Sequence, residues 1–399
     1  MVEIHAFRGR TVDPAWLDRV PSPAYDSLST PERRQFRIDN PYSYLNVTRA
    51  PEDEPPGAPT DNESLVAAAR QVLEALLADG AFNEADEPSL YLYRIAAGDH
   101  RQTGIVCEAS VTDYAEGSIK AHEQIRGARA ELLGQHLLGV GHSSSPIALT
   151  FRSDQTVKAL IREGRKSDPI LAWDDGTIEQ VVWRMTDPQL VDPLIEALRT
   201  RPAYIIDGHH RAAAALAVKR GNGTAHGEDR MLSVLFPDDA LLLLGFNRVV
   251  TGLSVDEAGA LVGKVKETFT VTRSETAPQP NRGQLGLYAK GHWHLVDLGE
   301  APADPLAALD PVRLQDEILA PMLGISAPGS DPRLNTVSGD QHCDRLEQMV
   351  DTDGGVAFVV PSLTMEDLFV VADAGLTMPP KSTYFTPKVR SGVFLRSIN

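Results

Sequence analysis

Cysteine is scarce in this chain: Cys107 and Cys343 are the only two among 399 residues. Two cysteines argue against the disulfide frameworks that stabilise small secreted proteins, and they rule out a cysteine-rich zinc site. The N-terminal residues also lack the basic and then apolar layout of a secretory signal peptide. We therefore expect a cytoplasmic protein.

Long hydrophobic runs and an excess of basic residues are missing as well. The apolar stretch at 240–245 is far shorter than the roughly 20 residues that a membrane-spanning helix needs. Lysine and arginine total 38 against 55 aspartates and glutamates, a formal net charge of −17 that repels nucleic acids and anionic membranes. The densest basic clusters, at 33–37 and 126–129, lack the aromatic pattern of single-strand binders. We expect them to be solvated helix faces, with neither a nucleic acid nor a membrane as partner.

The remaining composition is that of an ordinary globular protein, with 42% hydrophobic and 23% charged residues. Apolar residues at helical spacing predict a helix over 62–79, and alternating runs at 90–95 and 104–111 predict two strands around a turn. Because such strands come in pairs and do not alternate strictly with helices, we expect an α+β fold with mixed sheets.

The expected elements divide the chain into three parts. These are a main α+β domain over 1–250, a small α+β insertion or subdomain over 251–305, and a C-terminal segment over 306–399 that packs back on the main domain. Within the first part, 231–236 and 241–246 are expected to form an exposed hairpin. A hairpin of this kind could pair with a copy of itself, so the sequence leaves a homodimer open.

The most informative segment reads Tyr-Ile-Ile-Asp-Gly-His-His-Arg and is followed by an alanine-rich stretch. A β-branched strand ends at Asp207, Gly208 permits a tight bend, and a helix begins. Backbone N–H groups, His209, His210 and Arg211 then lie at the positive end of a helix, where anions and phosphates bind favourably. A purely structural role, in which Asp207 caps the helix and the histidines pack, is the alternative.

Two further pairs of residues are candidates for substrate contact. Tyr25 and Asp26 lie in a turn and offer a hydroxyl and a carboxylate. His122 and Glu123 stand where a helix is expected to begin; Glu123 has the chemistry of a general base, and His122 could donate to a phosphate or carboxylate. Helix capping and a solvated helix face are the respective alternatives.

Lys381, Ser382 and Thr383 form the last candidate, a polar cluster between prolines. The order Lys-Ser-Thr resembles the phosphate-binding end of a P-loop, but the glycines of that loop are absent. A rigid lysine and two hydroxyls could still clamp a phosphate or carboxylate, and a proline-braced surface turn is the alternative.

These motifs together resemble a known family along nearly the whole chain. In sequence order they are Tyr25-Asp26, Asn40-Pro41, Tyr91-Leu92-Tyr93, Gly104-Ile105, His122-Glu123, Asp207-Gly208-His209-His210-Arg211, Asn247-Arg248, and Met378 through Lys388 with Ser391-Gly392. The pattern resembles the bacterial and archaeal Domain of Unknown Function family ten-fifteen. The glycine-containing corner is in addition similar to the nucleotide-binding corner of the ParB/sulfiredoxin superfamily, which includes kinases of free L-serine. The resemblance implies a ParB/sulfiredoxin-like nucleotide-binding core. Sulfiredoxin has a cysteine where His209 stands, so sulfinic-acid repair is not expected.

We therefore expect a phosphotransferase that moves a phosphoryl group from ATP or ADP, with Mg²⁺, to free serine or a similar hydroxy amino acid. Gly208 and the helix N-terminus would cradle phosphate, the side chains of 209–211 would neutralise its charge, and Asp207 or Glu123 would accept the hydroxyl proton. Two alternatives stay open. One is a nucleotide-binding regulatory module without transfer activity. The other is a metal-dependent phosphoesterase that uses His122 with the two corner histidines, although their spacing matches no zinc signature and we expect no protein-bound metal.

Overall fold

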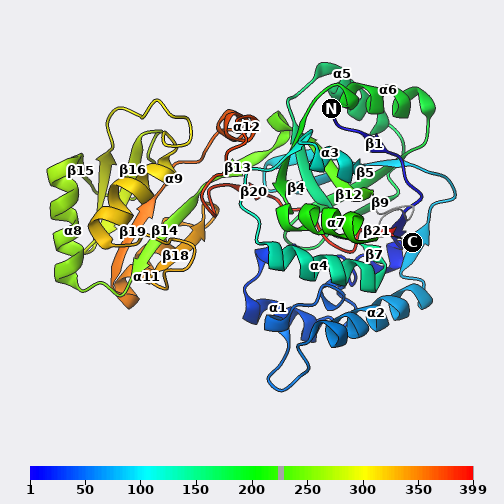
Figure 1. Ribbon diagram of the computed structural model, residues 1–399, viewed down its shortest axis with the longest axis horizontal. Helices are drawn as coiled ribbons and strands as arrows, with labels where there is room; N and C mark the ends of the chain where they lie inside the picture. Colours follow the sequence, from blue (N-terminus) through cyan, green and yellow to red (C-terminus); the bar gives the residue numbers. More distant parts are fainter. Residues whose placement is uncertain (223–228, 399) are drawn as a thin grey trace. The chain divides into compact units, whose positions relative to one another are not determined.

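The computed structural model describes residues 1–222 and 229–398 (Figure 1). Its contacts form two compact units. Unit 1 consists of Met1–Ala121, Ile125–Leu241 and Pro387–Asn399, and unit 2 consists of His122–Gln124 and Leu242–Thr386. Each unit is therefore formed by segments that are not contiguous in the sequence.

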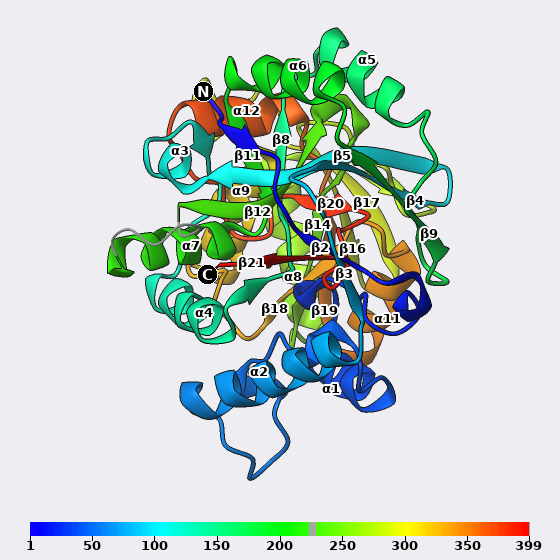
Figure 2. The same ribbon diagram turned by 90° about the vertical axis from the view of Figure 1, so that its right-hand side faces the viewer.

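Unit 1 is built around a nine-stranded mixed sheet (Figure 2). In order across the sheet, the strands are β6 (Ile119–Lys120), β11 (Ala203–Asp207), β8 (Ile147–Phe151), β12 (Arg230–Pro237), β5 (His100–Ser110), β4 (Leu90–Ala97), β10 (Glu179–Met185) and β9 (Leu171–Asp174), with β1 (Ile4–His5) on β5. The pairs β6–β11 and β8–β12 are parallel, and the other pairs are antiparallel. The expected α+β class with mixed sheets is confirmed.

Helices and a small second sheet complete unit 1. The helices are α1 (Thr30–Asp39), α2 (Asn62–Ala78), α3 (Val111–Ala115), α4 (Gly127–Val140), α5 (Gln155–Gly164), α6 (Pro188–Arg199) and α7 (His209–Asn222). The second sheet has the order β3 (Phe82–Glu84), β2 (Arg10–Val12), β21 (Phe394–Ser397) and β7 (His142–Ser143). Helix α7 packs on α4, and α4 packs on α2 (Figure 2). Among residues 1–222 and 229–398, no helix combines the length and apolar character that a bilayer crossing requires.

Helix α2 shows why the sequence-based expectation succeeded for this element. The side chain of Asp61 accepts a hydrogen bond from the backbone N–H of Ser64 and caps the helix start. Leu65, Leu73 and Leu76 are buried on one face. Local capping and apolar spacing agree, so the predicted helix over 62–79 is confirmed to within a residue.

The expected hairpin over 231–246 is wrong. Strand β12 lies inside the large sheet between β5 and β8, and all of its residues except the first are buried. The short strand β13 (Leu242–Leu244) pairs instead with β20 (Tyr384–Thr386). A mostly apolar run such as β12 is typical of an interior strand with partners on both sides, and it offers no free edge to a second copy.

Unit 2 is built around a six-stranded antiparallel sheet. The strands, in order, are β15 (Thr270–Ser274), β17 (His292–Asp297), β16 (Gln284–Ala289), β19 (Gly355–Val359), β14 (Phe246–Thr251) and β18 (Leu334–Ser338). The helices are α8 (Val255–Thr268), α9 (Asp310–Arg313), a π-helix at Leu314–Leu319, α10 (Ala320–Leu323), α11 (Cys343–Asp353) and α12 (Met365–Asp373). Leu287 packs in the core that contains α8, and its neighbour Tyr288 packs with α11, so the two helices cover opposite faces of the sheet.

The boundaries of unit 2 differ from the expected ones at 250 and 305. The segment 251–305 does contain a helix and a strand pair, as expected of a small α+β element, and these are α8, β16 and β17. Strands β14, β18 and β19 come from either side of that segment in the sequence and complete the same sheet. Long-range strand pairing, which local sequence patterns do not reveal, places the boundaries at 242 and 386.

Candidate functional site

The strand–turn–helix corner has the predicted local structure. Strand β11 ends at Asp207 and α7 starts at His209, with Gly208 between them at a φ of 98°. A Cβ atom at Gly208 would lie 2.9 Å from the guanidinium atoms of Arg211. Glycine is therefore required both for the left-handed backbone and for the close approach of the arginine side chain.

Arg211 holds the corner to the loop before β8. Its Nη1 atom donates to the carbonyl oxygens of Ser145, over 2.9 Å, and Pro146, over 2.6 Å. Its Nη2 atom donates to Asp207. Because these contacts are internal, Arg211 braces the corner in addition to placing positive charge there.

The two histidines of the corner are also held in place. The backbone N–H of Arg126, just before α4, donates to Nε2 of His210 over 3.2 Å and so ties the start of α7 to the start of α4. His209 is 4% exposed, so its ring is enclosed by the protein. With these side chains enclosed or hydrogen-bonded, the start of α7 is held by the surrounding structure, and a helix start is a favourable place for an anion.

Lys388, which no sequence pattern singled out as a site residue, joins this corner to a distant turn of unit 1. Its ammonium donates to Asp207 Oδ1 over 2.8 Å and to Asp26 Oδ2 over 2.5 Å. Burial alone would raise the pKa of Asp207, but the charges of Lys388 and Arg211 outweigh it and hold that pKa well below its usual range. Burial would lower the pKa of Lys388, but Asp207 and Asp26 outweigh it and raise that pKa above its usual value. Lys388 therefore stays charged, and Asp207 stays ionised with both oxygens bound by cations.

The turn that carries Asp26 is fixed by an arginine that the sequence analysis placed in solvent. The turn is a 3₁₀ helix at Tyr25–Ser27. Arg33 is only 6% exposed; it donates to the carbonyl oxygen of Leu28 over 2.7 Å and pairs with Asp53 over 2.8 Å. Its guanidinium also lies 4.0 Å from the ring centre of Tyr25. The expectation of a solvated face is wrong here, because the guanidinium has these internal partners.

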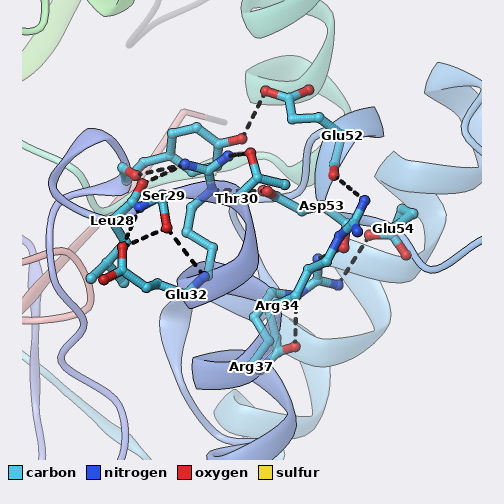
Figure 3. Close-up of polar contacts among 12 residues, drawn as sticks. Leu28, Ser29, Thr30, Glu32, Arg34, Arg37, Glu52, Asp53 and Glu54 are labelled. Carbon is cyan, nitrogen blue, oxygen red and sulfur yellow. Dashed lines mark hydrogen bonds and ion pairs between the residues drawn. The ribbon is translucent and has the colours of Figure 1, made fainter. Parts of the chain in front are cut away.

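Polar contacts continue along α1 through Arg34 and Arg37 (Figure 3). Arg37 pairs with Glu54 over 3.0 Å, and Arg34 donates to the carbonyl oxygen of Glu52 over 2.6 Å. The hydroxyl of Tyr25 donates to the Glu52 side chain over 3.0 Å. Burial, and then the neighbouring carboxylates, raise the pKa of the Tyr25 hydroxyl far above its ordinary value. Tyr25 is therefore a neutral donor within this network, whereas the Asp26 side chain remains 48% exposed.

In unit 2 the structure brings His122 together with the C-terminal polar loop. The carbonyl oxygen of His122 accepts from the backbone N–H of Met378 over 2.8 Å, and Glu123 and Met378 form an isolated parallel bridge. The Nε2 atom of His122 lies 3.1 Å from Oγ1 of Thr383. The helix expected at 120–123 is wrong: Ile119–Lys120 form strand β6, parallel to β11, and α4 starts only at Gly127.

The Lys381–Thr383 loop is braced by Arg248, a residue quoted from the sequence only as part of the family pattern. Arg248 is 7% exposed and donates to the carbonyl oxygen of Lys381 over 2.9 Å; burial lowers its pKa to about 10. Lys381 has a φ of 59°, which is unusual for a residue with a side chain. Ser382 is buried, and its hydroxyl donates to the carbonyl oxygen of Pro379 over 2.8 Å. The hydroxyl of Ser382 is thus engaged within the loop.

The candidate residues therefore form two groups. Unit 1 holds Tyr25, Asp26, Asp207, Gly208, His209, His210 and Arg211, and unit 2 holds His122, Glu123, Lys381, Ser382 and Thr383. Lys388 links Asp26 to the corner in the first group, and a side-chain contact links His122 to Thr383 in the second. In the part of the chain that the structure describes, no three His, Cys, Asp or Glu side chains are grouped to hold a metal ion.

Comparison with solved structures finds distant similarities. A free serine kinase in complex with AMP is 16% identical, with a TM-score of 0.38; the match covers 73% of this chain and 91% of that one. A mutant free serine kinase in complex with ADP gives the same values. SbnI with a C-terminal truncation, from Staphylococcus aureus, is 14% identical, with a TM-score of 0.36; the match covers 70% of this chain and 82% of that one. Scores this low describe only a remote likeness.

Comparison with whole protein families gives a firmer result. No curated protein matches the chain. A family model described as "Protein of unknown function (DUF1015)" matches residues 4–312, which is well over half of the sequence. This is the family that the sequence motifs resemble, so the chain belongs to the DUF1015 family.

Proposed function

We propose that this protein is a phosphotransferase that moves a phosphoryl group from a nucleotide to the hydroxyl of a small molecule, free serine or a similar hydroxy amino acid. The observation that carries the proposal is the corner of unit 1, where Gly208 opens the start of α7. The N–H groups at a helix start and the helix dipole attract phosphate, and His209, His210 and Arg211 add donors or positive charge. Phosphoryl transfer mainly requires such positioning and charge neutralisation.

Glu123 is the better of the two candidates for the group that accepts the hydroxyl proton. Asp207 has both carboxylate oxygens bound by cations, which hold its pKa well below the usual range and make it a weak base. Glu123 is partly exposed, and the bridge to Met378 fixes its backbone. In unit 2, Lys381 and Thr383 are the candidates for contacts to phosphate and His122 for a contact to the acceptor. In unit 1, Asp26 is the candidate for a contact to the acceptor, with Tyr25 in support.

Mg²⁺ would enter with the nucleotide. The oxygens of Asp207 are engaged by Lys388 and Arg211, and the described residues contain no metal-binding group of three. These residues therefore fit a metal held mostly by phosphates and water, as is usual for Mg²⁺ in such enzymes. Bound in this way, the ion would neutralise phosphate charge.

Phosphorus NMR with mass spectrometry, on protein supplied with Mg²⁺, ATP or ADP and a mixture of free amino acids, tests the transfer. We expect a new phosphomonoester signal with the mass of a phosphorylated hydroxy amino acid. Glu123→Gln should slow its formation by roughly a hundredfold or more. Glu131→Gln, an exposed position on α4, is the matched control and should retain the parent rate. Equal rates for the parent and Glu123→Gln would remove Glu123 from the mechanism.

A nucleotide-binding module without transfer activity is the second candidate. It is favoured by the internal contacts of Arg211 and His210, which leave the backbone N–H groups as the main anion ligands of the corner. Nucleotide binding measured by calorimetry, without a phosphorylated product, would support this candidate over the kinase. Release of inorganic phosphate alone would favour a phosphoesterase, or a kinase that was not supplied with its true acceptor.

A further inference from the structure

Lys388 lies between two carboxylates that are far apart in the sequence. Asp26 is 362 residues away and Asp207 is 181 residues away, yet both accept hydrogen bonds from the same ammonium. The side chains of Lys388 and Asp207 are 13% and 14% exposed, so water screens their charges weakly. The three segments of unit 1 that meet here are the turn at Tyr25–Ser27, the end of β11 and the residues after unit 2.

Two carboxylates and two cationic side chains are joined at this point. Asp26 and Asp207 carry two negative charges, and Lys388 and Arg211 carry two positive charges. Without Lys388, two carboxylates would face one arginine beside the start of α7. A negative charge at that position would oppose the attraction of the helix start for phosphate.

We propose that Lys388 is a positioning residue that keeps the start of α7 able to bind nucleotide phosphates, because its ammonium neutralises Asp26 and Asp207 together. The inference rests on the proposed function, since it assumes that the corner binds a nucleotide. It assigns Lys388 no contact with the substrate. It also gives Asp26 an effect on phosphate affinity, because this carboxylate offsets one positive charge beside the start of α7.

The segment that carries Lys388 has other anchors, so loss of this side chain should not release it. Arg390 pairs with Asp175 over 2.7 Å, and the side-chain amide of Gln102 donates to the carbonyl oxygen of Pro387 over 3.0 Å. Arg396 pairs with the buried Glu108. A change at Lys388 can therefore be studied in a folded full-length protein.

Calorimetric titration with ADP and with adenosine, which lacks phosphate, tests the inference on five proteins. They are the parent, Lys388→Met, Asp26→Asn, the double variant Asp26→Asn/Lys388→Met, and the control Lys158→Met. Lys158 pairs with Asp239 elsewhere in unit 1. The control tests the loss of a lysine charge away from the corner and should bind both ligands like the parent.

Lys388→Met should bind ADP about tenfold more weakly, because a nearby uncompensated carboxylate repels phosphate. Its affinity for adenosine should change less than about twofold by the same reasoning. The double variant should recover most of the ADP affinity, and Asp26→Asn alone should bind ADP about threefold more tightly than the parent. A residue that acted only by packing would give neither the recovery nor the difference between the two ligands.

Three results would overturn the inference. The first is an unchanged ADP affinity in Lys388→Met; the second is an equal loss for ADP and adenosine without recovery in the double variant. The third result applies if Lys388→Met does not fold, so that Asp26→Asn alone tests the inference. In that case the inference is overturned if Asp26→Asn binds ADP no more tightly than the parent does. Failure of the parent itself to bind ADP would instead refute the proposed function, so the two failures are distinguishable.

Discussion

At the scale of single residues, Gly208 meets two separate requirements, and they can be separated by comparison with Gly117. Both glycines have a positive φ, 98° at Gly208 and 81° at Gly117. A Cβ at Gly117 would meet nothing within 4 Å, whereas at Gly208 it would approach the Arg211 guanidinium to 2.9 Å. Gly117→Ala should therefore lower the unfolding free energy only by the cost of a left-handed backbone for alanine, about 1–2 kcal/mol.

Gly208→Ala should cost about 1–3 kcal/mol more than Gly117→Ala, because Arg211 must move and its contacts with the loop before β8 must weaken. Urea unfolding of the two variants and the parent measures the difference. Equal losses of stability would mean that the side chain of Arg211 moves aside without cost.

The stability contributed by Asp207 should depend on pH in a defined direction. Its pKa in the folded protein lies below that of the unfolded chain, so its contribution is present above the unfolded value of about 4 and is lost as pH falls through the folded value. The free energy of unfolding of the parent should exceed that of Asp207→Asn at pH 7, and this difference should shrink on acidification below about pH 4. Urea unfolding of the parent and of Asp207→Asn at a series of pH values measures this difference. A difference that grew on acidification would contradict the assignment.

The stability contributed by Lys388 should depend on pH in the opposite direction. Its pKa is raised in the folded protein, so its contribution is fully present below the unfolded value of about 10.4 and is lost only as pH rises through the folded value. Neither group should change its contribution between about pH 6 and pH 9. Between these pH values, a change in measured ligand affinity is therefore not caused by a change in the contribution of Asp207 or Lys388 to folding stability.

At the scale of elements, the buried pair of Arg33 and Asp53 connects α1 to both neighbouring turns. Arg33→Met removes the guanidinium and leaves the Asp53 carboxylate buried without its charge partner. We expect a loss of about 3–5 kcal/mol in unfolding free energy. Arg33→Met/Asp53→Asn should be more stable than Arg33→Met alone, because the uncompensated charge is gone. Chemical denaturation of both variants measures their unfolding free energies. A double variant that is less stable than Arg33→Met would contradict the expected effect of the uncompensated charge.

Elements that depend on local sequence were predicted well. The helix over 62–79 and the strands at 90–95 and 104–111 are present as α2, β4 and β5, since capping and apolar spacing act over a few residues. The pairing at Ile119–Lys120 and the partners of β12 depend on chain far away in the sequence, and there the predictions failed. Sheet neighbours are set by tertiary packing, which a local pattern does not encode.

The candidate site divides in the same way. The corner around Gly208 was found because strand, turn and helix are consecutive in the sequence. Lys388, Arg33 and Arg248 received no role, because each acts on groups outside its own segment. Charge and residue type alone do not tell a buried lysine between two carboxylates from an exposed one.

At the scale of the whole molecule, each unit has a hydrophobic core of its own. Leu149 lies in the core of unit 1 and Leu287 in the core around α8, and both are fully buried. Replacing either with alanine should cost about 2–5 kcal/mol. In calorimetric unfolding we expect Leu149→Ala and Leu287→Ala to lower different transitions. A single transition lowered equally by both would show that the two cores unfold together.

The return of the chain to unit 1 after residue 386 bears on how the protein is made. Strand β21 and Lys388 belong to the unit that starts at the N-terminus, but the ribosome releases them only after all of unit 2. Residues 242–386 can already pair their own strands, whereas the earlier part of the chain must wait for an edge of its small sheet and for the partner of Asp207. In this molecule the unit that is translated first is therefore completed last, and the corner at Gly208 gains its final charge after synthesis of unit 2 has ended.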